Sequence, residues 1–315
     1  MTTEPTGFGE NTLIKIASIK DSELCYNTSP DLHTGEYYNY CLRLLSEAVS
    51  EHMDPVNVVF GDIDFNFENN NPTLKIDIQP EHTLVKAGGR SVEEVVRGTV
   101  KTSEEDNYLV RIPNFDYYSK LDATIEYSIP NIKNIQTAQD SRYLDYGKTA
   151  FYIAPMIYSD IEFDSTTKTE TVTLFSDNPS DRRSGYLKES GTRNIKNVFS
   201  KEALRSLYYN SKILVNIHQT DHHHTFEELR VLPALCNGVV IVSEDVPLRH
   251  KIAYSNSIVW SSYEDLPQTV AEVQTNYDEY YHRIFTDGFK QQLHQIEENN
   301  KETFKKLLCL KIKTI

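Results

Sequence analysis

The stretch Lys212–Glu244, KILVNIHQTDHHHTFEELRVLPALCNGVVIVSE, predicts the fold of this chain. Its first six residues are mostly aliphatic or β-branched, which predicts a short buried strand. A polar loop follows, and the segment from Thr225 to Glu228 fits a capping box that opens a helix. Gly238 is typical of the end of that helix, and VVIV predicts a second buried strand. Strand, loop, helix and strand together form one βαβ unit of a parallel sheet.

Polar side chains gather where this unit would bind a ligand. Parallel α/β sheets bind ligands beyond the carboxyl ends of their strands, where loops and helix N-termini meet. The residues predicted at that edge are His218, Thr225, Glu227, Glu228 and Arg230.

The order of predicted elements divides the chain into two α/β halves. In the first half, strands are predicted at 13–18, 57–60, 73–78, 108–112, 123–127 and 150–154, with helices at 36–51 and 92–96. In the second half, strands are predicted at 171–175, 213–217, 239–242 and 258–260, with helices at 201–210, at 227–236 and throughout the chain after 264. The polar segment 160–169 suits a linker. We therefore predict two Rossmann-like domains, residues 1–165 and 166–315.

Composition excludes several classes of protein. The net charge of −14 argues against a nucleic-acid backbone as the main partner, but allows a local basic pocket for a small phosphate-bearing ligand. The sequence contains no run of eighteen apolar residues and no signal-peptide pattern, so we expect no transmembrane segment. The four cysteines lack CxxC spacing, which is typical of reduced cysteines in a cytoplasmic protein.

Four segments in order resemble a known family. TLFSDNPSDRR at 173–183 is followed by KILVNIHQ, EELR and GVVIVSE, as in the carboxyl-terminal half of GT-B-fold nucleotide-sugar glycosyltransferases of small viral, bacterial or exostosin-like type. The resemblance covers residues 171–265 and is only architectural over 1–160. It implies two Rossmann-like domains that face each other across a cleft. It also implies transfer of a sugar from a nucleotide sugar, expected to be UDP-linked, to a glycan or glycoprotein acceptor.

The resemblance assigns donor binding to the second domain. Arg182 and Arg183 follow a strand and Arg230 opens a helix, so they are expected to neutralise the diphosphate with the helix N-terminus and without a metal. The other residues expected to bind the nucleotide sugar are His218, Thr225, Glu228 and Glu244. Alternatively, the two adjacent arginines form a solvated turn, Arg230 pairs with Glu227, and Glu244 belongs to a strand-ending turn.

One departure from the family concerns stereochemistry. Retaining GT-B enzymes usually carry two glutamates eight positions apart, the second lying five residues before the glycine that ends the helix. Here those positions hold Thr225 and Pro233, neither of which is acidic. Glu228 or Glu244 would have to replace the missing ribose-binding carboxylate, and we expect an inverting enzyme.

The first domain is expected to bind the acceptor and to supply the catalytic base. An inverting transfer needs one group that takes the proton of the acceptor hydroxyl. Glu81 is our first choice and His82 the second, because Gln79-Pro80 ends the preceding strand and should direct the next two side chains into the cleft. Asp62 and Asp64 follow another strand and are alternatives. Any of these residues could equally be an ordinary loop side chain.

The histidine run His222–His224, with His218 nearby, raises the question of a metal. Three consecutive histidines cannot all face one ion from a regular element, and no carboxylate stands at the spacing of a zinc motif. We therefore expect no metal and no resident cofactor, only the donor substrate. Two other interpretations stay open: a non-catalytic GT-B-like protein that binds carbohydrate or nucleotide, and a metallohydrolase built on the histidines.

Overall fold

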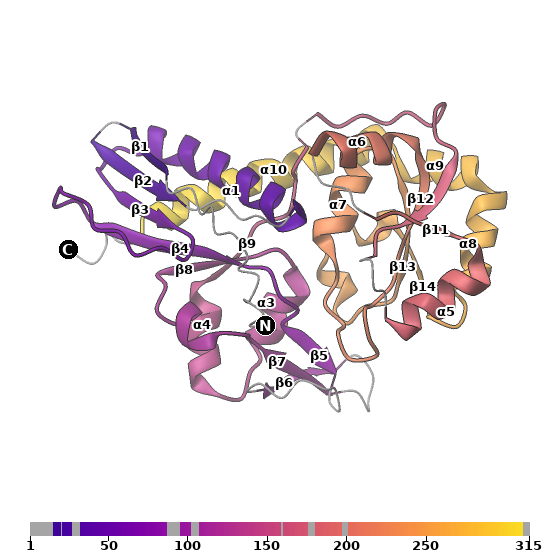
Figure 1. The fold of residues 1–315 in the computed structure, drawn as a ribbon, viewed down its shortest axis with the longest axis horizontal. Coiled ribbons are helices and arrows are strands. Elements are labelled where there is room, and N and C mark those ends of the chain that lie inside the picture. The colour runs from indigo at the N-terminus through magenta and orange to yellow at the C-terminus, as the bar shows by residue number, and fades with distance from the viewer. Residues whose placement is uncertain are drawn as a thin grey trace, which may run out of the picture.

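The computed structural model describes residues 15–19, 21–26, 32–86, 95–101, 107–158, 160–175, 180–196 and 201–310. Two sheets, each mainly parallel, form separate halves of the molecule, with helices packed around them (Figure 1). This confirms the predicted α/β class with two parallel sheets. No helix in the described part of the chain is long and apolar enough to span a lipid bilayer.

The first half contains a six-stranded sheet in the order β1-β2-β3-β4-β8-β9. Its strands are β1 (Lys15–Ile19), β2 (Ser22–Tyr26), β3 (Asn57–Phe60), β4 (Thr73–Gln79), β8 (Ala123–Glu126) and β9 (Ala150–Tyr152). Only the outer pair β1 and β2 is antiparallel. Because the other strands run in one direction, β3, β4, β8 and β9 all end at the same edge of the sheet.

The second half contains a five-stranded, fully parallel sheet in the order β11-β10-β12-β13-β14. Its strands are β10 (Glu170–Thr173), β11 (Arg193–Asn194), β12 (Ser211–Asn216), β13 (Val240–Glu244) and β14 (Ile258–Ser261). The aliphatic residues of β12 and β13 are buried, as expected for central parallel strands covered on both faces. Gly238 precedes β13 at a φ of 67°, and a Cβ there would lie 3.3 Å from the backbone of Phe163, so this close approach requires glycine.

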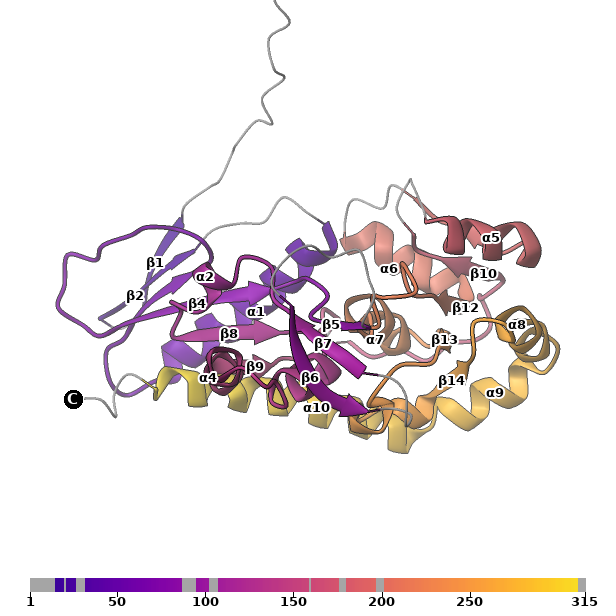
Figure 2. The same cartoon turned by 90° about the horizontal axis from the view of Figure 1, so that it is seen from below.

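Ten α-helices are described, and the last one joins the halves. They are α1 (Leu32–Glu51), α2 (Phe115–Tyr118), α3 (Ile129–Ile135), α4 (Ser141–Thr149), α5 (Asp181–Ser190), α6 (Lys201–Asn210), α7 (Glu228–Cys236), α8 (Leu266–Thr275), α9 (Tyr277–Ile284) and α10 (Asp287–Leu308). Helix α10 leaves the second half and packs on α1 of the first (Figure 2). The Asn300 amide accepts from Ala154 N at 3.0 Å and donates to Ala154 O at 2.8 Å, which fixes the segment after β9.

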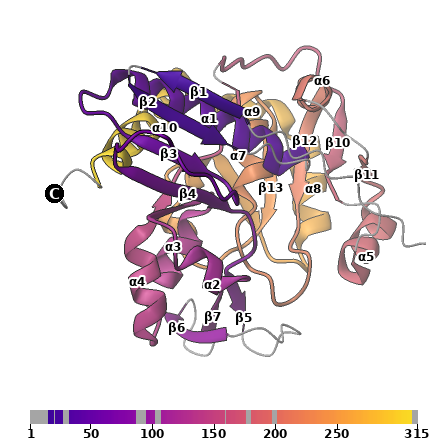
Figure 3. The ribbon, with the colours of Figure 1, turned by 60° about the vertical axis from the view of Figure 1, so that its left-hand side comes forward.

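A small antiparallel sheet lies beside the first half and reaches the second. It comprises β5 (Leu84–Lys86), β7 (Asn107–Arg111) and β6 (Val95–Lys101), in that order, and contacts α3 (Figure 3). Val85 forms an antiparallel bridge with His223, which belongs to the loop between β12 and α7. The halves are therefore joined by backbone pairing as well as by α10.

Two local predictions are wrong. The segment predicted as a helix at 92–96 enters strand β6 at Val95, while 91–94 lie outside the described residues. The capping box is also absent, because α7 follows Glu227, which makes no side-chain cap. Thr225 Oγ1 instead donates to Asn131 Oδ1 at 2.7 Å and accepts from Leu84 N at 3.2 Å. Partners from the first half thus replace the local hydrogen bond.

The position of the domain boundary stays a prediction. The first sheet ends in sequence with Tyr152 and the second begins with Glu170, so residues 165 and 166 lie between them. Because α10 packs on the first half, residues of the predicted second domain contribute to both cores.

Candidate functional site

The carboxyl edges of the two large sheets meet at a junction of charged side chains. From the second sheet come α5 after β10, the loop after β12, and the end of β13. From the first sheet comes the turn after β4, which carries His82. Its Nε2 lies 2.9 Å from Glu227 Oε1, a residue of the second half. The strand ends predicted to face each other therefore do so.

Arg182 and Glu244 form a bidentate pair across the strand ends of the second sheet. Nη1 of Arg182 donates to one carboxylate oxygen of Glu244 at 2.5 Å, and Nη2 donates to the other. The Arg182 Nε lies 2.8 Å from Asp221, and its guanidinium lies 3.7 Å from the centre of the Tyr263 ring. Burial acts to raise the pKa of Glu244, but the hydrogen bonds and charge of Arg182 hold it below its usual value. In this structure the two side chains therefore neutralise each other.

Arg183 lies beside this pair in a different environment. Its side chain is almost fully buried, with Nε and Nη2 donating to Ile217 O at 3.1 and 2.7 Å and the guanidinium 4.5 Å from the centre of the Phe175 ring. Burial, helped by the positive charge of Arg230, lowers the pKa of Arg183 to about 9. Among the described residues no carboxylate forms an ion pair with Arg183.

Arg230 and His82 share one carboxylate. Glu227 Oε2 lies 3.9 Å from Arg230 Nη2, and Oε1 lies 2.9 Å from His82 Nε2. Burial opposes ionisation of Glu227, but its interaction with His82, including a hydrogen bond, and the charge of Arg230 hold its pKa well below the usual range. Within the described part of the chain, Arg230 Nη1 and His82 Nδ1 are buried without a hydrogen-bond partner. Buried polar atoms are normally satisfied, so two such atoms beside the same carboxylate indicate a place where a ligand can bind.

The structure separates the two candidate bases. Glu81 is exposed, and its backbone is held by the buried amide of Gln79, which accepts from Glu81 N at 2.5 Å and donates to Glu81 O at 3.1 Å. His82 instead points into the junction, where its side chain is 17% exposed. The predicted turn therefore brings one of the two side chains between the halves and leaves the other in solvent. The alternatives Asp62 and Asp64 are also exposed.

Glu228 and Thr225 have structural partners in the position predicted for donor contacts. The Glu228 carboxylate is fully buried and accepts from Ile129 N at 3.0 Å, Tyr152 OH at 2.6 Å and Tyr254 OH at 2.7 Å. Burial raises its pKa to about 7. Thr225 is fully buried as well. Because the polar atoms of both side chains have protein partners, we leave both out of the proposed site.

The histidine run joins the halves by backbone pairing. Lys86 N donates to His222 O at 2.8 Å, and His224 N donates to Leu84 O at 3.2 Å. The His224 ring stacks on His218 with centroids 4.7 Å apart, and His218 Nε2 lies 3.0 Å from Asp245 O. Burial lowers the pKa of His224 to about 4. In the described ranges, no group of three or more His, Cys, Asp or Glu is arranged to hold a metal ion.

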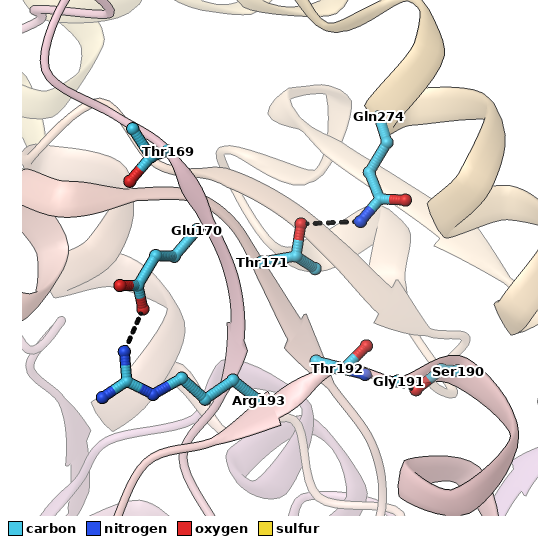
Figure 4. Close-up of a pocket in the computed structure, with 8 residues that line it drawn as sticks. All are labelled: Thr169, Glu170, Thr171, Ser190, Gly191, Thr192, Arg193 and Gln274. Atoms are coloured by element: carbon cyan, nitrogen blue, oxygen red, sulfur yellow. Dashed lines mark hydrogen bonds and ion pairs between the residues drawn. The ribbon is translucent and has the colours of Figure 1, made fainter.

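A shallow pocket lies at the opposite, amino edge of the second sheet (Figure 4). It has a volume of about 330 Å³ and is lined by Thr169, Glu170, Thr171, Ser190, Gly191, Thr192, Arg193 and Gln274. Its arginine is neutralised by Glu170 at 2.7 Å, and Gln274 donates to Thr171 at 2.9 Å. This pocket therefore offers no unbalanced charge to a ligand.

Three residues of the junction have no predicted role in donor binding or catalysis. Glu227 is placed from sequence at the ligand-binding edge and is named as a possible partner of Arg230, a contact that their spacing of three residues already signals on a helix. Asp221 and Tyr263 carry no signal, because their shared partner, Arg182, is 39 and 81 positions away in the chain.

Comparisons with known proteins give the following. No family model matches the chain. The uncharacterized protein R358 of Acanthamoeba polyphaga mimivirus is 26% identical over 273 residues, which cover 81% of this chain and 93% of that protein. The chain is similar in structure to the catalytic domain of starch synthase IV from Arabidopsis thaliana bound to ADP and acarbose. There the TM-score is 0.43 at 8% identity, over 95% of this chain and 84% of the other.

A second solved structure is the wall teichoic acid polymerase TagF, with a TM-score of 0.31 at 10% identity over 86% of this chain and 85% of the other. The fold class itself rests on the two parallel sheets described above.

Proposed function

We propose that this protein is a glycosyltransferase that moves a sugar from a nucleotide sugar, expected to be UDP-linked, to a hydroxyl of a glycan acceptor. One observation carries the proposal: in a buried junction, Glu227 pairs with Arg230 and His82, while the neighbouring Arg183 has no carboxylate ion-pair partner among the described residues. Buried charge without a partner is costly, so an anionic ligand would stabilise this arrangement. A diphosphate supplies that charge, and the site lies at the carboxyl ends of a parallel sheet, where such ligands bind.

The second half holds the donor in this proposal. Arg183 and Arg230 donate hydrogen bonds to the diphosphate, and the N-terminus of α7 adds its favourable dipole. As the bond to the sugar breaks, negative charge grows on the leaving oxygen, and preorganised cations stabilise it without a metal. Arg182, held by Glu244, borders this site, and His218 is placed beside the nucleotide.

The first half supplies the base, and we now rank His82 above Glu81. The imidazole points into the junction and its Nδ1 lacks a partner there, whereas the Glu81 side chain is exposed. His82 takes the proton of the acceptor hydroxyl while that oxygen forms a bond to the anomeric carbon. The bond from this carbon to the diphosphate breaks, and its electron pair leaves with the diphosphate. Inversion requires that the acceptor oxygen attack the face of the anomeric carbon opposite to the departing diphosphate.

A donor screen tests the proposal. The purified protein is titrated with a panel of nucleotide sugars and nucleoside diphosphates by calorimetry, and release of the nucleoside diphosphate is then followed with candidate acceptors. We expect micromolar to millimolar binding of one nucleotide class and release that depends on the acceptor. Binding without release of product from any member of the panel favours the non-catalytic alternative. If no nucleotide or nucleotide sugar of the panel binds, the proposed donor site is contradicted.

A further inference from the structure

We propose that Glu227 is a positioning residue for His82, and that it makes this imidazole an effective base through a contact between the two halves. The inference rests on the proposed function, since it concerns the same base. It goes further by giving a role to a carboxylate that belongs to the opposite half of the molecule.

The contact with Glu227 fixes which nitrogen of the His82 ring carries the proton. Glu227 Oε1 lies 2.9 Å from His82 Nε2 and, as a carboxylate oxygen, accepts a hydrogen bond from it. The neutral imidazole therefore carries its proton on Nε2 and its lone pair on Nδ1. Nδ1 is the ring atom that is buried without a partner. The His223 ring lies 5.3 Å away, centroid to centroid, and restricts the ring from another side. A histidine whose second nitrogen is bound by a carboxylate has a fixed tautomer and orientation.

The carboxylate and the imidazole come from opposite halves of the molecule. Glu227 immediately precedes α7 in the second half, whereas His82 follows β4 in the first. Their contact is surrounded by other contacts between the halves, including Lys86 N to His222 O at 2.8 Å and Ile129 N to Glu228 at 3.0 Å. The base in the first half is therefore completed by a carboxylate of the second half.

Glu227 also provides negative charge beside the imidazole. Glu227 does not accept the substrate proton; it keeps the Nε2 proton in place and stabilises the imidazolium that forms when Nδ1 is protonated. Its other oxygen lies 3.9 Å from Arg230, which favours the ionised carboxylate needed for this role. A diphosphate that binds Arg230 draws that cation towards itself, and Glu227 then acts mainly on His82.

Nitrogen-15 NMR of the histidine side chains tests the positioning role without any donor. The His82 signals are assigned by their loss in His82→Ala. We expect wild type to hold the Nε2-protonated tautomer and Glu227→Gln to show a mixture, because an amide can accept from or donate to Nε2. Glu170→Gln makes the same chemical change in an exposed ion pair at the far edge of the sheet and should match wild type. An unchanged tautomer in Glu227→Gln, or protonation of Nδ1 in wild type, overturns the inference.

Kinetics then separates this inference from the proposed function. In Glu227→Gln we expect kcat to fall about 10- to 100-fold with the donor KM changed only a few-fold, and Glu227→Asp should recover part of kcat. A wild type that transfers no sugar contradicts the proposed function whatever the tautomer. Transfer by Glu227→Gln at the wild-type kcat contradicts the positioning role alone. A loss that appears only in donor KM assigns Glu227 to donor binding and also overturns the inference.

Discussion

The two edges of the second sheet carry similar residues in opposite environments. At the amino edge, Arg193 is 65% exposed and pairs with Glu170 at 2.7 Å. At the carboxyl edge, Arg183 is 5% exposed and has no carboxylate partner among the described residues. Exposed ion pairs contribute little to stability, whereas buried charge must be compensated. Burial together with unbalanced charge, and not the presence of an arginine or a pocket, distinguishes the candidate site from the opposite edge.

Loss of the base should give the largest effect. His82→Ala removes the group that points into the junction, and we expect turnover to fall about 10²- to 10⁴-fold, the usual contribution of a general base. Binding of the nucleoside diphosphate should stay within a few-fold of wild type. The measurement is release of nucleoside diphosphate in the presence of acceptor.

Glu81→Gln is the matched comparison for the base. Because its side chain is exposed, turnover should stay within a few-fold of wild type. The opposite result, near-native His82→Ala and a large loss in Glu81→Gln, restores the ranking made from sequence.

Loss of the buried Glu228 carboxylate should destabilise the protein more than loss of the exposed Glu170 carboxylate. Glu228→Ala leaves Ile129 N and the hydroxyls of Tyr152 and Tyr254 without their acceptor in a fully buried place. We expect the free energy of unfolding to fall by about 3 kcal/mol, and that of the exposed-edge control Glu170→Ala by less than about 0.5 kcal/mol. Urea unfolding of the three proteins measures both. Equal midpoints for wild type and Glu228→Ala show that this carboxylate does not tie the halves together.

In the first sheet, the buried carboxylate of Glu126 should make stability depend on pH. Burial raises its pKa to about 8, from a usual value of 4.5. The folded state therefore binds more protons between these values, and the group's stabilising contribution, complete below about pH 4.5, is lost as the pH rises towards 8. Compared with Glu126→Gln, wild type should lose on the order of 1–3 kcal/mol between pH 5 and 8. If the free energies of unfolding of the two proteins change equally with pH over this range, the raised pKa of Glu126 is contradicted.

Chelation should have no effect. The proposed site neutralises the diphosphate with Arg183 and Arg230, so nucleotide binding and transfer should be equal with and without excess EDTA. A strict requirement for manganese contradicts both this neutralisation and the absence of a metal expected from sequence.

Sequence predicted the second half of the molecule better than the first for a physical reason. The central strands β12 and β13 are buried on both faces, so they are continuous aliphatic runs that stand out in sequence. Strand β2 and helices α3 and α4 lack that signal and were not predicted. Helix α5 was not predicted either, although it carries Arg182 and Arg183. Its sequence DRRSGYLKES has little apolar periodicity, and its cap is a single Ser180 hydroxyl that accepts from Arg183 N.

The candidate site could be predicted in outline only. Strand ends indicated where Arg183, Arg230 and His82 would lie, because parallel strands bring their carboxyl ends together. The pairings depend on residues far apart in sequence: Arg182 meets Glu244 62 positions away, and Glu228 meets Tyr152 76 positions away. Local pattern carries no information about such contacts, and it therefore could not indicate the partners from the first half that Thr225 and Glu228 have in the structure.

A calorimetric titration with UDP tests the donor site most directly. Wild type, Arg183→Ala and Arg193→Ala are compared under the same conditions, so that the same substitution is made at the buried and the exposed edge. We expect Arg193→Ala to bind as wild type does, and Arg183→Ala to bind about 10- to 100-fold more weakly, the scale of a charge-assisted hydrogen bond. Unchanged affinity in Arg183→Ala, or equal weakening in both variants, would contradict a diphosphate site at the carboxyl edge.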